Sequence, residues 1–122
     1  MRFLKSFLYA FNGLKRGVCF EKNFRIQLFF GVMVIITGAL LHISKLEWIA
    51  VILCISMVLS FEIFNSAVEA ICNFISPAIH PSIKIIKDLS AAAVLVAALA
   101  SAIVGSIIFL PKLYPVLSRF LH

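Results

Sequence analysis

The chain has 122 residues, of which 63% are hydrophobic and 13% charged, and its mean hydropathy is +1.13. A soluble domain of this length buries only about two-thirds of its unfolded surface, so this composition excludes most soluble folds. The net charge of +6 in so apolar a chain favours contact with anionic lipid headgroups, and we expect no nucleic-acid partner.

Residues 2–20 predict an amphipathic helix that lies along a membrane surface. Its polar residues recur at steps of three and four: Arg2, Lys5, Tyr9, Asn12 and Arg16. Apolar residues fill the other side of this helix, as is typical of interfacial helices. Gly13 and Gly17 weaken it in isolation, so we expect it to depend on the membrane or on the rest of the chain.

Three apolar segments follow, and each is long enough to cross a bilayer as a helix. They cover residues 26–43, 46–72 and 89–110. Because a helix rises about 1.5 Å per residue, about 18 residues just span the hydrocarbon layer. Trp48, near the start of the second segment, suits an interfacial anchor. The chain is therefore predicted to be a single all-α membrane domain, residues 1–122.

Prolines mark the expected ends of these spans. Pro77 and Pro81 separate the second span from the third, and Pro111 is expected to end the third. A short tail, residues 111–122, then remains, to which no function is assigned. The third span is rich in alanine, serine and glycine, which let helices approach closely, and this predicts packing within a homo-oligomer.

Basic residues predict the orientation in the membrane. Six precede residue 26, and Lys84 and Lys87 lie in the connection between the second and third spans. Only Lys45, Lys112 and Arg119 fall on the other side. Since basic loops stay in the cytoplasm, the N-terminus and residues 73–88 are predicted to be cytoplasmic.

Three polar side chains interrupt the second span. Glu62, Asn65 and Glu69 share one helix face over two turns. Ionised carboxylates in hydrocarbon are costly, so these groups should face protein, a cation or a water-filled cleft. A structural role, in which a protonated glutamate and the asparagine join helices, is the alternative, but an intramembrane stripe of this kind favours function.

More polar groups meet the same cytoplasmic boundary. Glu21 precedes the first span, and Lys87 and Asp88 open the third. Glu21 and Glu69 could share Mg²⁺, which is usually held by one or two carboxylates and completed by water and substrate phosphates. Lys87, with Arg2 on the surface helix, could meet phosphate charge, although a basic residue at a helix end is more often a snorkelling anchor.

Other features of the sequence are less specific. The three cysteines, Cys19, Cys54 and Cys72, sit in apolar helical patterns and are expected to be small buried hydrophobic residues. The sequence has no Walker phosphate-binding loop, no dinucleotide fingerprint and no zinc-binding spacing. From the residues alone, the chain is a small polytopic membrane protein with a polar site at its cytoplasmic surface.

Three stretches carry a family resemblance: GLKRGVCFEKNFRIQL (13–28), FEIFNSAVEAI (61–71) and KDLSAAAVLV (87–96). They resemble the prokaryotic diacylglycerol kinase family, which includes undecaprenol kinases, and the likeness covers about residues 2–111. It implies a surface helix and three membrane helices, assembled as a homotrimer in the bacterial plasma membrane.

The resemblance also implies transfer of the ATP γ-phosphate to a membrane lipid alcohol at the cytoplasmic face, with Mg²⁺ as cofactor. It implies that Glu62 is the general base, with Asn65 beside it, and that Glu21 and Glu69 hold the metal that accompanies ATP. The further residues implied to contact the nucleotide are Lys87, Asp88, Arg2, Tyr9 and His80.

Some positions depart from the family pattern. Asn73 stands where members usually have aspartate, and Gln27 where histidine is frequent. The sequences FLPK at 109–112 and HPSIK at 80–84 resemble the undecaprenol-kinase branch more than the diacylglycerol branch.

Two other functions are compatible with the polar second span. A small proton-coupled transporter or channel would also place a glutamate inside the membrane. A non-catalytic assembly subunit would use the small-residue third span as its main feature. The basic stripe on residues 2–20 favours the kinase over the transporter, because a transporter needs no phosphate-facing surface.

Overall fold

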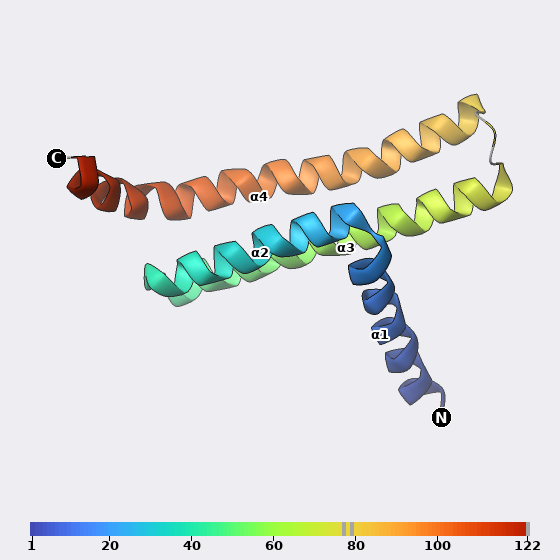
Figure 1. Ribbon diagram of the computed structural model, residues 1–122, viewed down its shortest axis with the longest axis horizontal. Helices are drawn as coiled ribbons and strands as arrows, with labels where there is room; N and C mark the ends of the chain where they lie inside the picture. The colour runs from blue at the N-terminus through green and yellow to red at the C-terminus, as the bar shows by residue number, and fades with distance from the viewer. Residues whose placement is uncertain (77, 79, 122) are drawn as a thin grey trace.

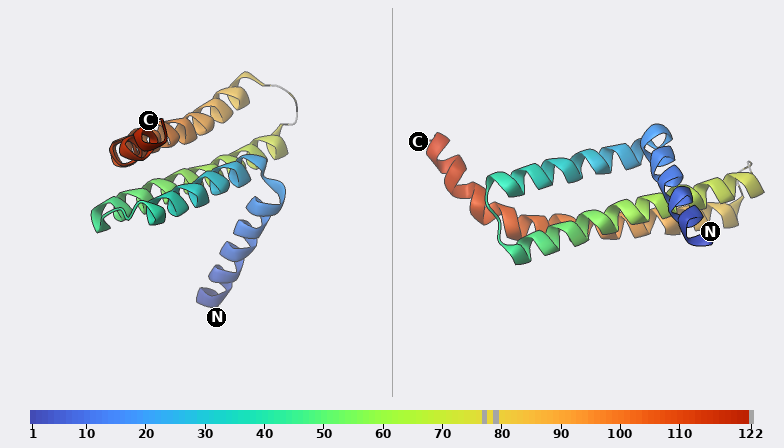
Figure 2. Two further views of the ribbon diagram at one scale, coloured as in Figure 1. Left: turned by 60° about the vertical axis from the view of Figure 1, so that its left-hand side comes forward. Right: turned by 90° about the horizontal axis from the view of Figure 1, so that it is seen from below.

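The computed structural model describes residues 1–76, 78 and 80–121, which form four α-helices. These are α1 (Arg2–Phe20), α2 (Lys22–Leu40), α3 (Lys45–Ile75) and α4 (Pro81–Leu121). α2, α3 and α4 run alongside one another, and α1 diverges from them (Figures 1 and 2). Within the described residues, three helices, α2 to α4, are long and apolar enough to cross a membrane.

The buried core of the chain is small and lies near the turn between α2 and α3. Its buried residues are Ile43, Val51, Ile108 and Phe109. Most large apolar side chains of α2, α3 and α4 are instead exposed on the outside of the helices. Since so large an exposed apolar surface is unfavourable in water, the outer faces of these helices are suited to contact with lipid acyl chains.

The junction between α1 and α2 consists of one residue, Glu21. Its backbone is extended (φ −107°, ψ 106°), and this redirects the chain from α1 into α2. Gly17 allows the two helices to touch, because a Cβ there would lie 3.3 Å from the Phe24 ring. The Arg25 guanidinium donates to the Val18 and Cys19 carbonyls at 3.2 and 3.0 Å, which satisfies the end of α1.

The turn between α2 and α3 has a well-defined cap at each side. His42 adopts φ 53°, and the N–H groups of His42 and Ile43 donate back to the Ala39 and Gly38 carbonyls. This is the Schellman arrangement that commonly ends a helix. α3 then begins with a capping box, in which the Ser44 hydroxyl accepts from the Glu47 N–H and the Glu47 carboxylate accepts from the Ser44 N–H.

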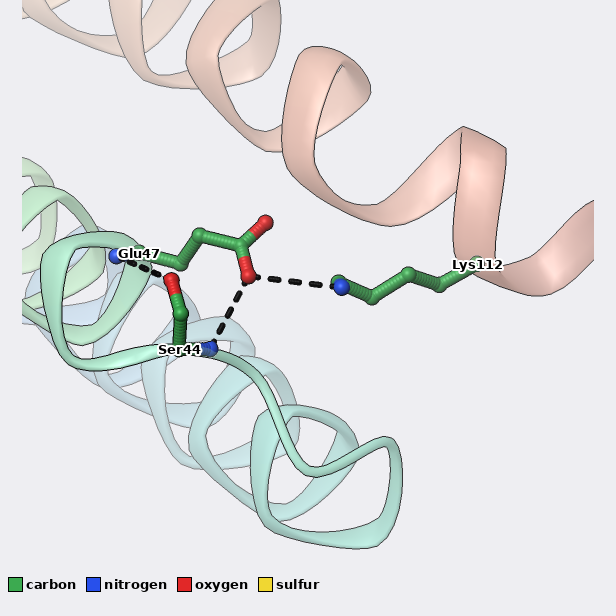
Figure 3. Close-up of polar contacts among 3 residues, drawn as sticks. All are labelled: Ser44, Glu47 and Lys112. Atoms are coloured by element: carbon green, nitrogen blue, oxygen red, sulfur yellow. Dashed lines mark hydrogen bonds and ion pairs between the residues drawn. The ribbon is translucent and has the colours of Figure 1, made fainter.

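An ion pair joins the start of α3 to α4. The Lys112 Nζ lies 3.3 Å from Glu47 Oε1, the same oxygen that accepts the Ser44 N–H (Figure 3). Both side chains are partly buried. The pair therefore fixes the register of α4 against α3 at the end of the bundle remote from Glu21.

Small residues carry the closest contacts between helices. A Cβ on Gly31 would lie 3.1 Å from Ile55 Cγ2, so α2 and α3 approach closely at this point. Ser101 on α4 donates to the Cys54 carbonyl on α3 at 3.5 Å.

Of the three cysteines, Cys72 is buried and Cys54 half-buried, but Cys19 is exposed, so the prediction of burial is wrong for Cys19.

The helices differ from the predicted spans at several ends: α2 begins at Lys22, α3 continues to Ile75 and α4 begins at Pro81. Residues 41–43, predicted to close the first span, form the turn after α2. The prediction that the helix of the third span stops at Pro111 is wrong, since α4 continues through Pro111 and Pro115 to Leu121 and the predicted tail is helical up to that residue. A membrane helix tolerates proline because each proline removes a single hydrogen bond, which neighbouring groups replace.

The connection between α3 and α4 is shorter than the predicted residues 73–88, since α3 continues to Ile75 and α4 begins at Pro81. Pro81 opens α4, where its missing N–H has no consequence and its fixed φ suits the first turn. Pro77, the other proline predicted to break the chain here, lies outside the described residues, as does His122 at the end of the predicted tail.

Candidate active site

Two polar residues are buried in the middle of α3. Glu62 is 5% exposed and Asn65 7% exposed. The Asn65 Oδ1 has no hydrogen-bond partner among the described residues. A buried polar atom without a partner is costly in a structural site, so this pair is better explained as an unfilled polar site than as a structural bond between helices.

Two more carboxylates lie within electrostatic range of Glu62. The negative charges of Glu69 and Glu21 both act on the Glu62 carboxyl. Glu69 follows Glu62 by two turns of α3 and is exposed, whereas Glu21 comes from the junction of α1 and α2 and is half-buried. The structure therefore brings the three predicted carboxylates to one region, from two separate parts of the chain.

A cavity of about 200 Å³ adjoins Glu21, while Glu62 and Glu69 are not among the residues that line it. Residues of α1, of α3 and of the start of α2 line it: Gly13, Arg16, Gly17, Glu21, Phe24, Ile63, Ser66, Ala67 and Ala70. Arg16 and Ser66 were not among the predicted site residues. Arg16 belongs to the polar stripe of residues 2–20 and was visible in that pattern, but the pattern did not indicate that it lines a cavity with Glu21.

A second polar cluster joins α3 and α4 beyond Glu69. The Lys87 Nζ donates to Asn73 Oδ1 at 2.8 Å, one helical turn past Glu69. Asp88 pairs instead with Lys84 at 2.6 Å, and both of these side chains are exposed. Asn73, which stands where family members usually have aspartate, thus holds Lys87 near Glu69.

The remaining predicted nucleotide residues do not join these groups within one chain. Arg2 precedes Gly13, the first cavity residue, by 11 positions, which is about 16 Å along the helix. Tyr9 lies one turn before Gly13, and its side chain is exposed. The His80 Nδ1 accepts from the Ser82 N–H at 3.1 Å and so caps the start of α4.

The carboxylates suit a magnesium ion that shares its ligands with a phosphate. Among the described residues, no three histidine, cysteine, aspartate or glutamate side chains are grouped to hold a metal by themselves. Glu21 and Glu69 supply hard oxygen donors within electrostatic range of Glu62, and Glu21 also lines the cavity. Mg²⁺ usually takes one or two carboxylates and completes its shell with water and phosphate, so this donor set fits it.

An open apolar groove of about 550 Å³ lies between α2 and α4, with α3 as its floor. The floor includes Val51, Ile55 and Val58, and one turn beyond Val58 the same face of α3 carries Glu62. Small residues of α4, among them Ala98 and Ala102, form one wall. The groove has the chemistry to hold a hydrocarbon chain.

Comparisons of the sequence with known proteins identify its family. The sequence model of the family described as "Prokaryotic diacylglycerol kinase" matches residues 8–109. The chain is 39% identical over 112 residues to the undecaprenol kinase of Bacillus subtilis, covering 92% of this chain and 91% of that protein. It is 38% identical over 111 residues to the diacylglycerol kinase of Synechocystis, covering 90% of this chain and 63% of that protein. It is 27% identical over 107 residues to the diacylglycerol kinase of Escherichia coli K12, covering 88% of each.

Proposed function

The chain belongs to the prokaryotic diacylglycerol kinase family and is a lipid kinase, and we propose that it transfers the γ-phosphate of ATP to a membrane lipid alcohol at the cytoplasmic face. The observation that supports this most strongly is that Glu69 and Glu21 lie within electrostatic range of the buried Glu62, one turn beyond the floor of an apolar groove. A lipid chain in the groove would bring its hydroxyl to Glu62.

Glu62 and Asn65 act at the lipid hydroxyl in this proposal. The Glu62 carboxylate takes the hydroxyl proton as the oxygen forms its bond to the γ-phosphorus, and the bond from that phosphorus to the bridging oxygen of ADP breaks. The Asn65 side-chain amide, buried on the same face of α3, donates from its Nδ2 to the hydroxyl oxygen, which orients the hydroxyl so that its one proton points to Glu62.

Glu21 and Glu69 would hold Mg²⁺, which offsets negative charge on the phosphates when it is bound. Lys87 releases Asn73 and turns toward the phosphates, and Arg16 contributes a further positive charge at the cavity. Phosphoryl transfer depends mainly on positioning and charge neutralisation, so this set suffices without a phosphate-binding loop.

Arg2, Tyr9, His80 and Asp88 are assigned to nucleotide contacts by the family resemblance alone. We propose a homotrimer, since the exposed small-residue surface of α4 favours close helix packing between copies. In the bacterial plasma membrane, the basic residues of α1 and of the α3–α4 connection would then lie in the cytoplasm.

The test is a phosphorylation assay in mixed micelles with Mg²⁺-ATP and either undecaprenol or diacylglycerol. Glu62→Gln keeps the size of the side chain and removes the proton acceptor, so turnover should fall by at least about a hundredfold, the usual contribution of a general base.

Glu47→Gln is the matched control, because Glu47 lies on the same helix but at its opposite end, paired with Lys112. This variant should retain its kcat. Full turnover by Glu62→Gln would overturn the assignment of the base, and turnover without a divalent cation would overturn the proposed role of Glu21 and Glu69.

A further inference from the structure

The last part of α4 extends past the ends of α2 and α3 (Figure 1). α4 has 41 residues and is about 60 Å long, twice the thickness of the hydrocarbon layer, at roughly 1.5 Å per residue. The uncharged stretch between Asp88 and Lys112 already spans that layer. Residues 112–121, here called the C-terminal segment, therefore lie beyond the hydrocarbon on the membrane face remote from Glu21.

The C-terminal segment has an apolar side and a polar side. At 100° per residue, Leu113, Val116, Leu117 and Phe120 share one side of the helix. Lys112, Ser118 and Arg119 share the opposite side. Beyond Leu113, which packs against the core, the described residues leave the apolar side uncovered, since Leu117 is 56% exposed and Phe120 85% exposed. A segment that projected straight into water would leave this apolar side hydrated.

The charge of the segment and the bend at its base both favour a position along a membrane surface. It contains no acidic residue, and Arg119 has no ion-pair partner among the described residues, whereas Lys112 is paired with Glu47. Pro111 and Pro115 weaken the helix at its base, and the end of α4 turns away from the line of the helix (Figure 2, right).

We propose that the C-terminal segment is an interfacial helix that lies on the membrane surface opposite the carboxylate site and binds anionic lipid headgroups through Arg119. Leu117 and Phe120 enter the boundary between headgroups and acyl chains, while Leu113 packs against the core of the chain. The family match ends at residue 109, so this inference does not rest on the proposed kinase reaction.

Electron paramagnetic resonance on the full chain in vesicles tests the proposal. Cys19, Cys54 and Cys72 are replaced, and a nitroxide is attached at Leu117→Cys or, as the matched control, at Ser118→Cys. In phosphatidylglycerol vesicles, the ratio of oxygen to nickel-chelate accessibility should be several-fold higher at position 117 than at 118. Ile107→Cys, exposed within the span, gives the value for a lipid-facing residue.

Three results would overturn the proposal. High nickel accessibility at both positions would mean a helix in water, and oxygen access without nickel access at both would mean a helix inside the hydrocarbon. Low access to both reagents at position 117 would mean contact with protein, such as a second copy.

The unmodified chain gives a second measurement. Trypsin supplied on both sides of the membrane should release the C-terminal segment several-fold more slowly in phosphatidylglycerol than in phosphatidylcholine vesicles. When the nitroxide measurement at position 117 is made in both lipids, Arg119→Gln should reduce the difference in accessibility between phosphatidylglycerol and phosphatidylcholine vesicles. Equal cleavage rates in both lipids would contradict the binding of anionic headgroups.

Discussion

Two glutamates on α3 show how environment separates a structural carboxylate from a reactive one. Glu47 is satisfied by the Ser44 N–H and by Lys112, and this arrangement explains its presence completely. Glu62 is buried beside Asn65, whose Oδ1 lacks a partner, and two other carboxylates act on it. The burial of Glu62 and Asn65 costs folding free energy within the chain, and this cost is typical of a site that is completed by a substrate.

Lys87 should contribute to ATP binding more than to the reaction rate. Lys87→Ala removes a positive charge one turn from Glu69, so the KM for ATP should rise about tenfold, on the order of 1.4 kcal/mol, with a smaller change in kcat. Lys84→Ala is the matched control, because Lys84 has the same charge but pairs with Asp88 at the surface. Equal effects of the two substitutions on KM would contradict the role of Lys87.

Periodicity and hydropathy predicted where helices form, but they did not predict how the helices meet. The helix expected over residues 2–20 forms, and three helices can span a membrane; the surface position of α1 stays a prediction. The stripe of Glu62 and Asn65 was visible because it depends on one helix. The cavity shared by Arg16 and Glu21 depends on the angle between α1 and α2, and the bond from Lys87 to Asn73 depends on how α4 packs against α3.

Pro111 shows the limit of a local rule. Proline breaks a helix in water because its missing hydrogen bond and its ring are costly in the helix interior. In α4, the ion pair of Lys112 with Glu47 and the burial of Phe109 hold the helix on either side of the proline. Tertiary contacts therefore outweigh the local preference.

The contact of α2 with α3 should be sensitive to one added methyl group. Gly31→Ala forces Ile55 to move by a few tenths of an ångström, because the new Cβ would lie 3.1 Å from its Cγ2. We expect a loss of about 1 kcal/mol in the free energy of unfolding, as in other overpacked sites. Gly105→Ala is the control, since nothing lies within 4 Å of the new Cβ, and helix propensity should make it neutral or stabilising.

Unfolding of these two variants in detergent, followed by far-ultraviolet circular dichroism, measures the difference. If both glycines tolerate alanine equally well, the close approach of α2 to α3 at Gly31 does not determine stability.

The wall of the apolar groove offers a test of lipid binding. Ala98→Phe places a ring in the groove, so the KM for the lipid should rise several-fold while the KM for ATP stays unchanged. Ala100→Phe puts the same ring on α4 outside the groove lining and should affect lipid binding less. A lipid KM that responds equally to both variants would place the lipid elsewhere.

The distribution of charge over the whole molecule predicts its orientation. Eight basic residues lie at the end that carries Glu21 and the α3–α4 connection, so this end should face the cytoplasm. In intact cells with a cysteine-free background, a membrane-impermeant maleimide should label Lys45→Cys, and it should label Lys84→Cys only after the cells are opened. The reverse pattern would contradict the predicted topology, and with it the supply of cytoplasmic ATP to the carboxylates.

The single-residue joint between α1 and α2 has a mechanical consequence. Glu21 alone carries the change of direction, and no flexible linker is available to absorb a rotation of α1. Any force that swings α1 about this pivot must therefore shift the Glu21 backbone relative to α3. Lateral pressure or curvature that tilts α1 is in this way transmitted, through one pair of torsion angles, to the spacing of the acidic groups.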